Sequence, residues 1–172
     1  MLNRNARVKR SKASEIVEAL RLKPGNVVVD IGAGGGHFVF DFAKAVGPTG
    51  RVYAIDTNKY YLELIREKAA QQGLLHVKEI KSDSAPFFPP ESIDLFFVRA
   101  VYHHLTDRVN YFKRLKPSLS ERGRVAIIDY DTSKMSFLWK YSSHSTSKEK
   151  IIKEMNEAGY KLVDDLDFLT EQ

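Results

Sequence analysis

Two adjacent histidines, His103 and His104, follow one of the most apolar runs of the chain, "IDLFFV" (93–98). Such a pair can be a metal site, a general base or part of the packing. Imidazole suits the first two roles because it binds metals and titrates near neutral pH. On a short helical turn, neighbouring side chains point about 100° apart, which disfavours joint ligation of one metal ion. We therefore expect no metal. His103 is the candidate base, with packing as its alternative, and His104 is expected to pack beneath the loop.

A glycine-rich turn follows the first apolar run: "VVVDIGAGGGHF" places Gly32, Gly34 and Gly36 at its end. Glycine suits a sharp turn with positive φ, and its missing Cβ lets a ligand approach the backbone amides. His37 stands where the dinucleotide fingerprint requires a third glycine, which disfavours a pyrophosphate site. No G-K-[ST] follows, which excludes a P-loop. The turn therefore predicts a ligand site of another kind.

Acidic residues end two further strand-like runs. Asp56 ends "RVYAID", 24 residues after Gly32, where a carboxylate can accept hydrogen bonds from the hydroxyls of a ribose. Asp83 ends "VKEIKSD" and precedes Ser84, a pair that can hold an adenine amino group. An aspartate at a strand end is also a common turn former or helix cap. Both interpretations apply to each of these residues.

Strand-like and helix-like patterns alternate along the chain. Short runs rich in β-branched and aromatic residues predict strands at 26–31, 51–56, 77–83, 93–98 and 124–129. Apolar residues at helical spacing predict helices between them, and Thr146 with Glu149 forms a capping box before the last helix. The alternation predicts a doubly wound α/β fold of three layers with a mostly parallel sheet. Such sheets bind ligands at the carboxyl ends of their strands.

As a set, these motifs resemble those of the class I S-adenosylmethionine-dependent methyltransferases. The stretches that carry the resemblance are "VVDIGAGGG", "YAID", "KSDS", "IDLFFVRAVYHHL" and "RLKPSLSERGRVAIIDYD", within residues 12–170. The chain is most similar to the methyltransferase-domain group of unassigned substrate, whose members carry H-H-[LI] after the fourth strand. The resemblance implies a Rossmann-like methyltransferase fold, S-adenosylmethionine as cofactor and S-adenosylhomocysteine as product.

The resemblance also implies roles for matching residues at the cofactor. Gly32 and Gly34 would pass beneath its methionine part, Asp30 would orient its amino group and Asp56 would hold its ribose. The ammonium group, the ribose diol and the adenine amine of this cofactor all donate hydrogen bonds, so carboxylates are suitable acceptors for it. The full set of implied cofactor-binding residues is Asp30, Gly32, Gly34, Asp56, Thr57, Asp83, Ser84 and Arg99.

On the acceptor side, the resemblance places the residues after the fourth strand near the methyl group. The catalytic candidates are His103 and Tyr102, and Asp129 and Tyr130 are further candidates for acceptor contact. A base is plausible because an oxygen or nitrogen acceptor loses a proton as it attacks. Positioning alone is the alternative, since a sulfonium methyl is already activated.

The chain departs from the family in two places. The segment "LKPSLSERGR" replaces the usual L-K-P-G-G-R, so we expect a longer turn before the fifth strand. Residues 160–172 are expected to form a sixth strand, after which the sequence stops. We expect that the last antiparallel strand of this fold belongs to a C-terminal segment that is missing from this sequence. The alternative is an open sheet edge that pairs with another chain and forms a homo-oligomer.

Composition limits the class of protein. With 172 residues, of which 43% are hydrophobic, we expect a basic arm at 1–12 and a single domain at 13–172. The chain has no cysteine, which excludes disulfides and thiolate sites. Residues 1–23 carry the whole net charge of +5, so the arm is a possible but disfavoured contact for nucleic acid. No run is long and apolar enough to span a membrane, and we expect a cytoplasmic protein.

The sequence therefore predicts an S-adenosylmethionine-dependent methyltransferase that acts by in-line displacement on a small-molecule acceptor. The alternative is a non-catalytic cofactor-binding or scaffold protein that uses the same fold to bind a partner.

Overall fold

The computed structural model describes residues 12–82, 86–129 and 146–166. The chain forms two compact units, residues 1–81 and 82–172. The single domain expected over 13–172 stays a prediction.

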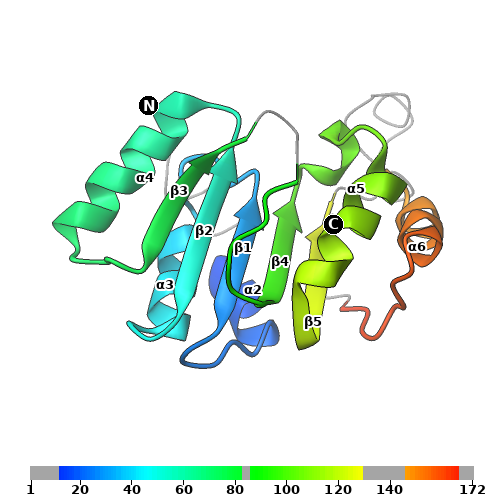
Figure 1. The fold of residues 1–172 in the computed structure, drawn as a ribbon, viewed down its shortest axis with the longest axis horizontal. Coiled ribbons are helices and arrows are strands. Elements are labelled where there is room, and N and C mark those ends of the chain that lie inside the picture. Colours follow the sequence, from blue (N-terminus) through cyan, green and yellow to red (C-terminus); the bar gives the residue numbers. More distant parts are fainter. Residues whose placement is uncertain (1–11, 83–85, 130–145, 167–172) are drawn as a thin grey trace. The chain divides into compact units, whose positions relative to one another are not determined.

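Three parallel strands form the centre of the first unit (Figure 1): β1 at Val27–Ile31, β2 at Arg51–Asp56 and β3 at Val77–Lys81. β2 is the middle strand, since Val52 is paired with Val28 on β1 and with Val77 on β3. Residues 28–31 and 52–55 are buried without interruption. This pattern is typical of parallel strands, whose apolar residues do not alternate with polar ones.

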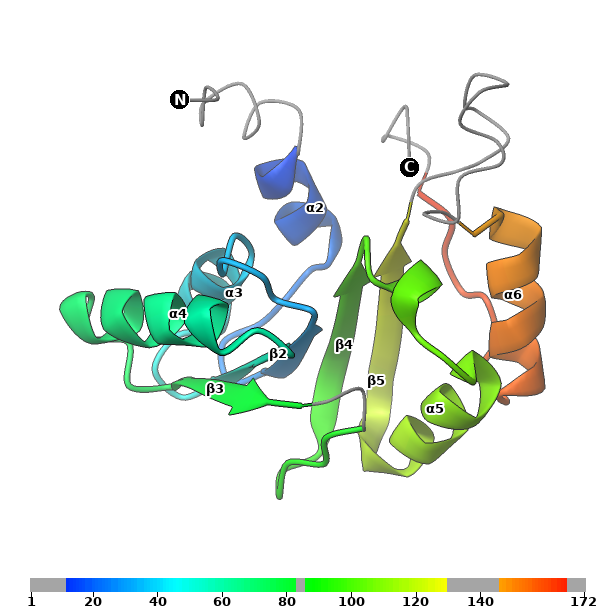
Figure 2. The ribbon, with the colours of Figure 1, turned by 90° about the horizontal axis from the view of Figure 1, so that it is seen from above.

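Three helices accompany these strands: α2 at Ala13–Ala19, α3 at Val39–Val46 and α4 at Lys59–Gln71. Figure 2 shows α3 and α4 on the same face of the strands of this unit. The apolar stripe expected for α3 is buried. α4 begins directly after β2 because the side chain of Asn58 accepts a hydrogen bond from the Tyr60 amide at 3.0 Å.

The second unit contains two parallel strands, β4 at Ile93–Arg99 and β5 at Leu119–Ile128. A short 3₁₀ turn, η1 at Tyr102–His104, follows β4 and carries the two histidines. It leads into α5 at Arg108–Leu115, which ends at a second 3₁₀ turn, η2 at Lys116–Ser118. α5 lies against α6 at Lys148–Glu157 (Figure 1).

The long turn expected before the fifth strand is instead part of β5. Ile93 is paired with Leu119 but Leu95 with Arg124, so the extra residues form a bulge in the strand. Gly123 is required there, since a Cβ would lie 2.5 Å from the Ile93 carbonyl oxygen. The turn was misplaced because sequence shows an insertion without showing whether a neighbouring strand absorbs it.

The last helix begins one residue later than the capping box predicted. Ser147 is the N-cap, and its hydroxyl accepts from the Lys150 amide at 3.3 Å, whereas Thr146 is buried. Serine and threonine are both good caps, so residue type did not separate them.

The strand expected at 160–172 is wrong for its described part. Residues 160–166 form no strand, and their apolar side chains Leu162, Val163 and Leu166 are exposed. A strand is stabilised by cross-strand pairs and burial, and the exposed side chains lack both. Residues 167–172 lie outside the described part of the chain.

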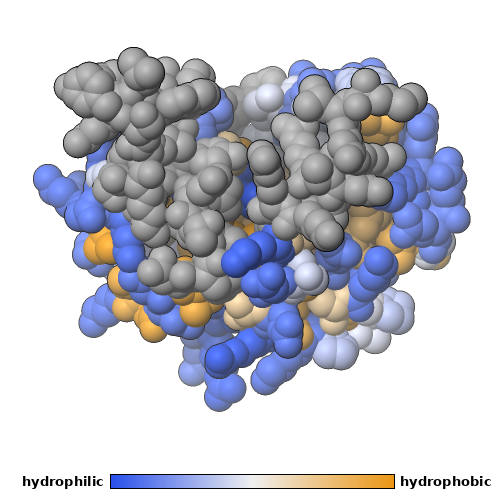
Figure 3. Space-filling model, turned by 180° about the vertical axis from the view of Figure 1, so that it is seen from behind, coloured by the Kyte–Doolittle hydropathy of each residue, from blue (hydrophilic) through white to orange (hydrophobic). Residues whose placement is uncertain are grey.

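Hydrophilic residues predominate on the described surface shown in Figure 3, with hydrophobic ones in scattered areas. In the described ranges, no helix combines the length and apolar character needed to cross a bilayer. The basic arm lies outside these ranges except for Lys12, and the cytoplasmic location stays a prediction.

Candidate functional site

The glycine turn after β1 is fixed by backbone hydrogen bonds within the first unit. Gly32 and Gly34 have φ of 75° and 51°, in the left-handed region that favours glycine. The amides of Gly32 and Ala33 both donate to the carbonyl oxygen of Ile55, at 2.8 and 2.9 Å. The turn is therefore attached to the carboxyl end of β2, next to Asp56.

Asp56 connects the glycine turn with the start of α4. One carboxylate oxygen accepts from the Gly34 amide at 2.8 Å, and the other accepts from the Asn58 amide at 2.8 Å. Each carboxylate oxygen can accept a second hydrogen bond. The carboxylate thus fixes the turn and keeps the acceptor capacity that a ribose diol needs.

The glycines of this turn have different surroundings. A Cβ added at Gly34 or Gly35 would meet no heavy atom within 4 Å. At Gly36 it would lie 2.7 Å from Ile65 Cγ1 and 3.0 Å from Phe40 Cε2. Gly36 is therefore required for packing, whereas Gly34 and Gly35 border open space in which a ligand can approach the backbone.

The structure describes three of the other residues expected at the cofactor. Asp30 is buried, with 3% of its surface exposed, and Thr57 is exposed beside Asp56. Arg99 ends β4 in the second unit. Asp83 and Ser84 lie outside the described residues.

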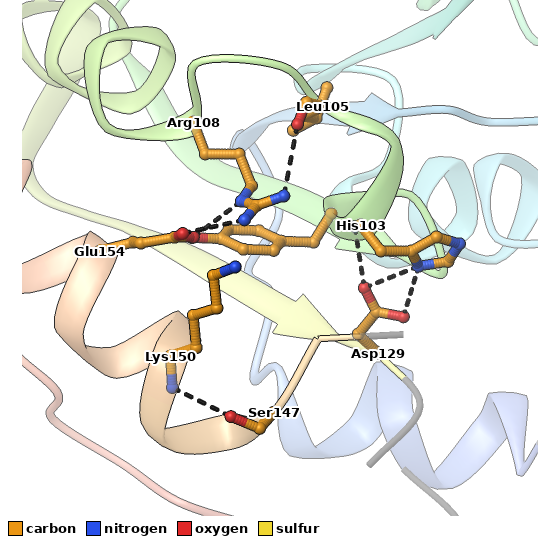
Figure 4. A network of polar contacts seen from close by, with 8 residues as sticks. His103, Leu105, Arg108, Asp129, Ser147, Lys150 and Glu154 are labelled. Atoms are coloured by element: carbon orange, nitrogen blue, oxygen red, sulfur yellow. Dashed lines mark hydrogen bonds and ion pairs between the residues drawn. The ribbon is translucent and has the colours of Figure 1, made fainter. Parts of the chain in front are cut away.

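His103 forms a compact pair with Asp129, which directly follows β5 (Figure 4). The two Asp129 oxygens lie 2.9 and 3.0 Å from His103 Nδ1. One of them also accepts from the His103 backbone amide at 3.1 Å. The side chains are 6% and 1% exposed, respectively, so the pair is formed away from bulk water. The structure thus joins two acceptor-side candidates that are 26 residues apart.

His104 does not pack beneath the loop as expected, because it is exposed. The expected divergence of the two rings is also wrong: their centroids lie 4.0 Å apart. Helical geometry determines the Cα–Cβ directions, while the rotamers determine where the rings lie. Among the described residues, no group of three or more His, Asp or Glu side chains suits a metal ion.

Tyr102 is fully buried in the second unit. Its hydroxyl donates to Glu154 on α6 at 2.8 Å, and its ring stacks on Phe112. Burial, followed by the neighbouring Glu154 carboxylate, raises the pKa of Tyr102. The hydroxyl therefore stays protonated, and its hydrogen bond to Glu154 holds the turn in place. Both observations argue against catalysis by this side chain.

Glu154 and Arg108 complete a cluster that sequence analysis missed. Arg108 donates to the two Glu154 oxygens at 2.7 and 2.8 Å, and its guanidinium lies over the Tyr102 ring. Hydrogen bonding from Arg108 lowers the pKa of Glu154, and the same contact raises the pKa of Arg108. The cluster fixes α6 and α5 to the turn that carries His103. Glu154 lies 46 residues beyond Arg108, and no local pattern signals such a contact.

Solved structures of other proteins share the fold of this chain. A methyltransferase of Aquifex aeolicus described as S-adenosylmethionine dependent has a TM-score of 0.73 and 26% identity, with 86% of this chain and 78% of that chain covered. Coclaurine N-methyltransferase, in a structure bound to N-methylheliamine and S-adenosylhomocysteine, has a TM-score of 0.61 at 19% identity, with 71% and 38% covered. The fold is the Rossmann-like methyltransferase fold, as expected.

The sequence comparisons define the family. Residues 22–164 match the family model described as "Methyltransferase domain". The chain belongs to this family of S-adenosylmethionine-dependent methyltransferases. It is 29% identical over 119 residues to the ubiquinone/menaquinone biosynthesis C-methyltransferase UbiE of Burkholderia mallei, which covers 69% of this chain. The chain spans about half the length of that relative, 49%.

Proposed function

We propose that this chain transfers a methyl group from S-adenosylmethionine to a small-molecule acceptor by in-line displacement. Family membership supports the reaction class. The observation that carries the proposal is the glycine turn, where open space at Gly34 and Gly35 adjoins the Asp56 carboxylate. This combination suits a ligand that presents hydroxyl donors and no phosphate group.

In this proposal, the first unit binds the cofactor. Asp56 accepts hydrogen bonds from the ribose hydroxyls while it holds the Gly34 amide. Gly32 and Gly34 allow the methionine part to approach the backbone, Asp30 orients its amino group, and Thr57 lies next to the ribose. Asp83 and Ser84 for the adenine and Arg99 as a further contact stay predictions.

His103 is the proposed group on the acceptor side, and Tyr102 supports the turn that carries it. When bound, S-adenosylmethionine supplies a methyl group that its sulfonium already activates, so positioning accounts for much of the rate. The UbiE relative is described as a ubiquinone/menaquinone biosynthesis C-methyltransferase, which supports a ring compound related to quinones as acceptor for this chain. The atom that this relative methylates is not carried over to this chain. Nucleic-acid contact through the arm and homo-oligomer formation stay predictions.

Calorimetric titration with S-adenosylhomocysteine tests the cofactor site. We expect the unmodified chain to bind S-adenosylhomocysteine. In Gly34→Ala the affinity should fall tenfold or more, because the added Cβ enters the ligand's space. Gly73→Ala is the matched control, because Gly73 has a similar φ of 65° and equally open surroundings away from the turn. Absence of binding to the unmodified chain, or equal loss in both variants, contradicts the proposed site.

Turnover distinguishes the enzyme from a non-catalytic cofactor-binding scaffold. Release of S-adenosylhomocysteine is measured with S-adenosylmethionine and a panel of small aromatic hydroxyl compounds. Acceptor-dependent release supports the methyltransferase. Binding of the cofactor without release over the whole panel supports the scaffold instead.

A further inference from the structure

The contacts between His103 and Asp129 determine which ring nitrogen carries the proton. A carboxylate can only accept hydrogen bonds, and here both Asp129 oxygens face Nδ1. The backbone amide of His103 donates to the same carboxylate, which acts as acceptor in this contact as well. Nδ1 must therefore be the donor, and in the neutral ring the lone pair lies on Nε2. Figure 4 shows this second nitrogen on the side of the ring turned away from Asp129.

We propose that Asp129 is the positioning residue for His103, and that Nε2 of His103 takes the proton of a weakly acidic hydroxyl on the methyl acceptor. This inference rests on the proposed function. The Asp129 side chain is 1% exposed, so water competes little for the carboxylate. Two bonds to one carboxylate, from the ring and from the backbone of the same residue, fix the ring orientation as well as its tautomer.

The chemistry of the base points to a hydroxyl acceptor. A neutral amine attacks through its own lone pair, and a thiol ionises near pH 8.5 without help. A phenolic hydroxyl ionises near pH 10, so at neutral pH it gains most from a base held in place. In the proposed step the O–H bond breaks and its proton goes to Nε2. The oxygen bonds to the methyl carbon while the carbon–sulfur bond breaks, and that bonding pair stays on sulfur.

The tautomer can be measured without cofactor or acceptor. We expect nitrogen NMR of the ¹⁵N-histidine-labelled chain at pH 8 to show His103 protonated at Nδ1, with the signal assigned by its loss in His103→Gln. In Asp129→Asn, the amide oxygen meets the His103 backbone N–H and the amide NH₂ faces Nδ1, so we expect the proton to move to Nε2. Asp107→Asn, the same change at an exposed position of this unit, should leave the signal unchanged. A proton on Nε2 in the unmodified chain, or one tautomer in both forms, overturns the proposal.

Turnover with catechol tests the proton transfer itself. At pH 7 we expect Asp129→Asn and His103→Gln to lower turnover about 100-fold or more, with S-adenosylhomocysteine affinity unchanged. The defect should shrink towards pH 10, where the phenol ionises unaided. His104→Gln, a change of the exposed neighbour, is the control and should keep full turnover.

An equal defect at both pH values, or no methylation of catechol by a cofactor-loaded chain, overturns the proposal. Failure to bind the cofactor contradicts the proposed function instead and leaves the NMR result to decide the role of Asp129.

Discussion

At the scale of single residues, Asp56 has a structural role in the glycine turn and a proposed role in cofactor binding. Its two oxygens hold the amides of Gly34 and Asn58, one in the glycine turn and one before α4. An aspartate at a strand end is often only a turn former. Here the same carboxylate fixes the turn and, in our proposal, accepts hydrogen bonds from the ribose, so loss of the carboxylate should affect both.

Asp56→Asn tests this double role. An asparagine offers one acceptor oxygen, so one of the two amides would face an NH₂ group. We expect unfolding of the unliganded chain to require about 1 kcal/mol less free energy, measured by urea denaturation, and S-adenosylhomocysteine affinity to fall tenfold or more. Asp41→Asn removes a half-exposed carboxylate in the first turn of α3, whose contact with Lys44 spans 3.7 Å. It should leave the affinity unchanged and lower the free energy of unfolding by at most about 0.5 kcal/mol. Unchanged affinity in Asp56→Asn would leave Asp56 as a turn former only.

At the scale of elements, the turn η1 depends on helices that follow it in the chain. Tyr102 is held by Glu154 of α6 and covered by Arg108 of α5. Glu154 and Arg108 are 16% and 17% exposed, so their contact is far less solvated than an ordinary surface ion pair. The position of His103 in this unit therefore depends on the packing of α6.

Glu154→Gln should reduce the stability of this packing in a pH-dependent way. Because Arg108 lowers the pKa of Glu154, the carboxylate stabilises the fold above its ordinary pKa of 4.5, and this contribution is lost as pH falls through the lower, folded value. We expect the variant to lose about 2 kcal/mol of unfolding free energy at pH 7. The difference from the unmodified chain should narrow below pH 4.5.

Glu157→Gln is the matched control for this measurement. It lies on the same helix, and its contact with Lys153 spans 3.9 Å between exposed side chains. Urea denaturation at pH 7 should show a change within about 0.5 kcal/mol. Equal losses in the two variants would contradict a special role for the Glu154 cluster.

At the scale of the whole molecule, the two compact units bear on the expected single domain. If residues 13–172 fold as one domain, calorimetry should show one unfolding transition that shifts upward as a whole with S-adenosylhomocysteine. At a ligand concentration about 100 times the dissociation constant, binding adds about 2.7 kcal/mol. Two transitions, of which only one shifts with ligand, would instead show that the units unfold separately.

The sequence by itself determined four of the five strands and the family. β2 was predicted residue for residue, and β1, β3 and β4 within one or two residues, because short runs rich in β-branched and aromatic residues identify strands. The glycine turn and Asp56 were found for a similar reason: both belong to a local strand–turn–strand pattern. Elements without burial, such as the segment 160–166, were predicted less well.

Only the tertiary structure decided which histidine lies against Asp129. His103 and His104 are identical in type and adjacent in sequence, yet it is the ring and the backbone amide of His103 that lie within hydrogen-bonding distance of Asp129. That contact forms because β4 and β5 pair in parallel, which brings the residues beyond their carboxyl ends together. The hydrogen bond between Tyr102 and Glu154 joins residues 52 positions apart, and it depends on the packing of α6. Local propensity carries no information about such pairs, since strand register and helix packing determine them.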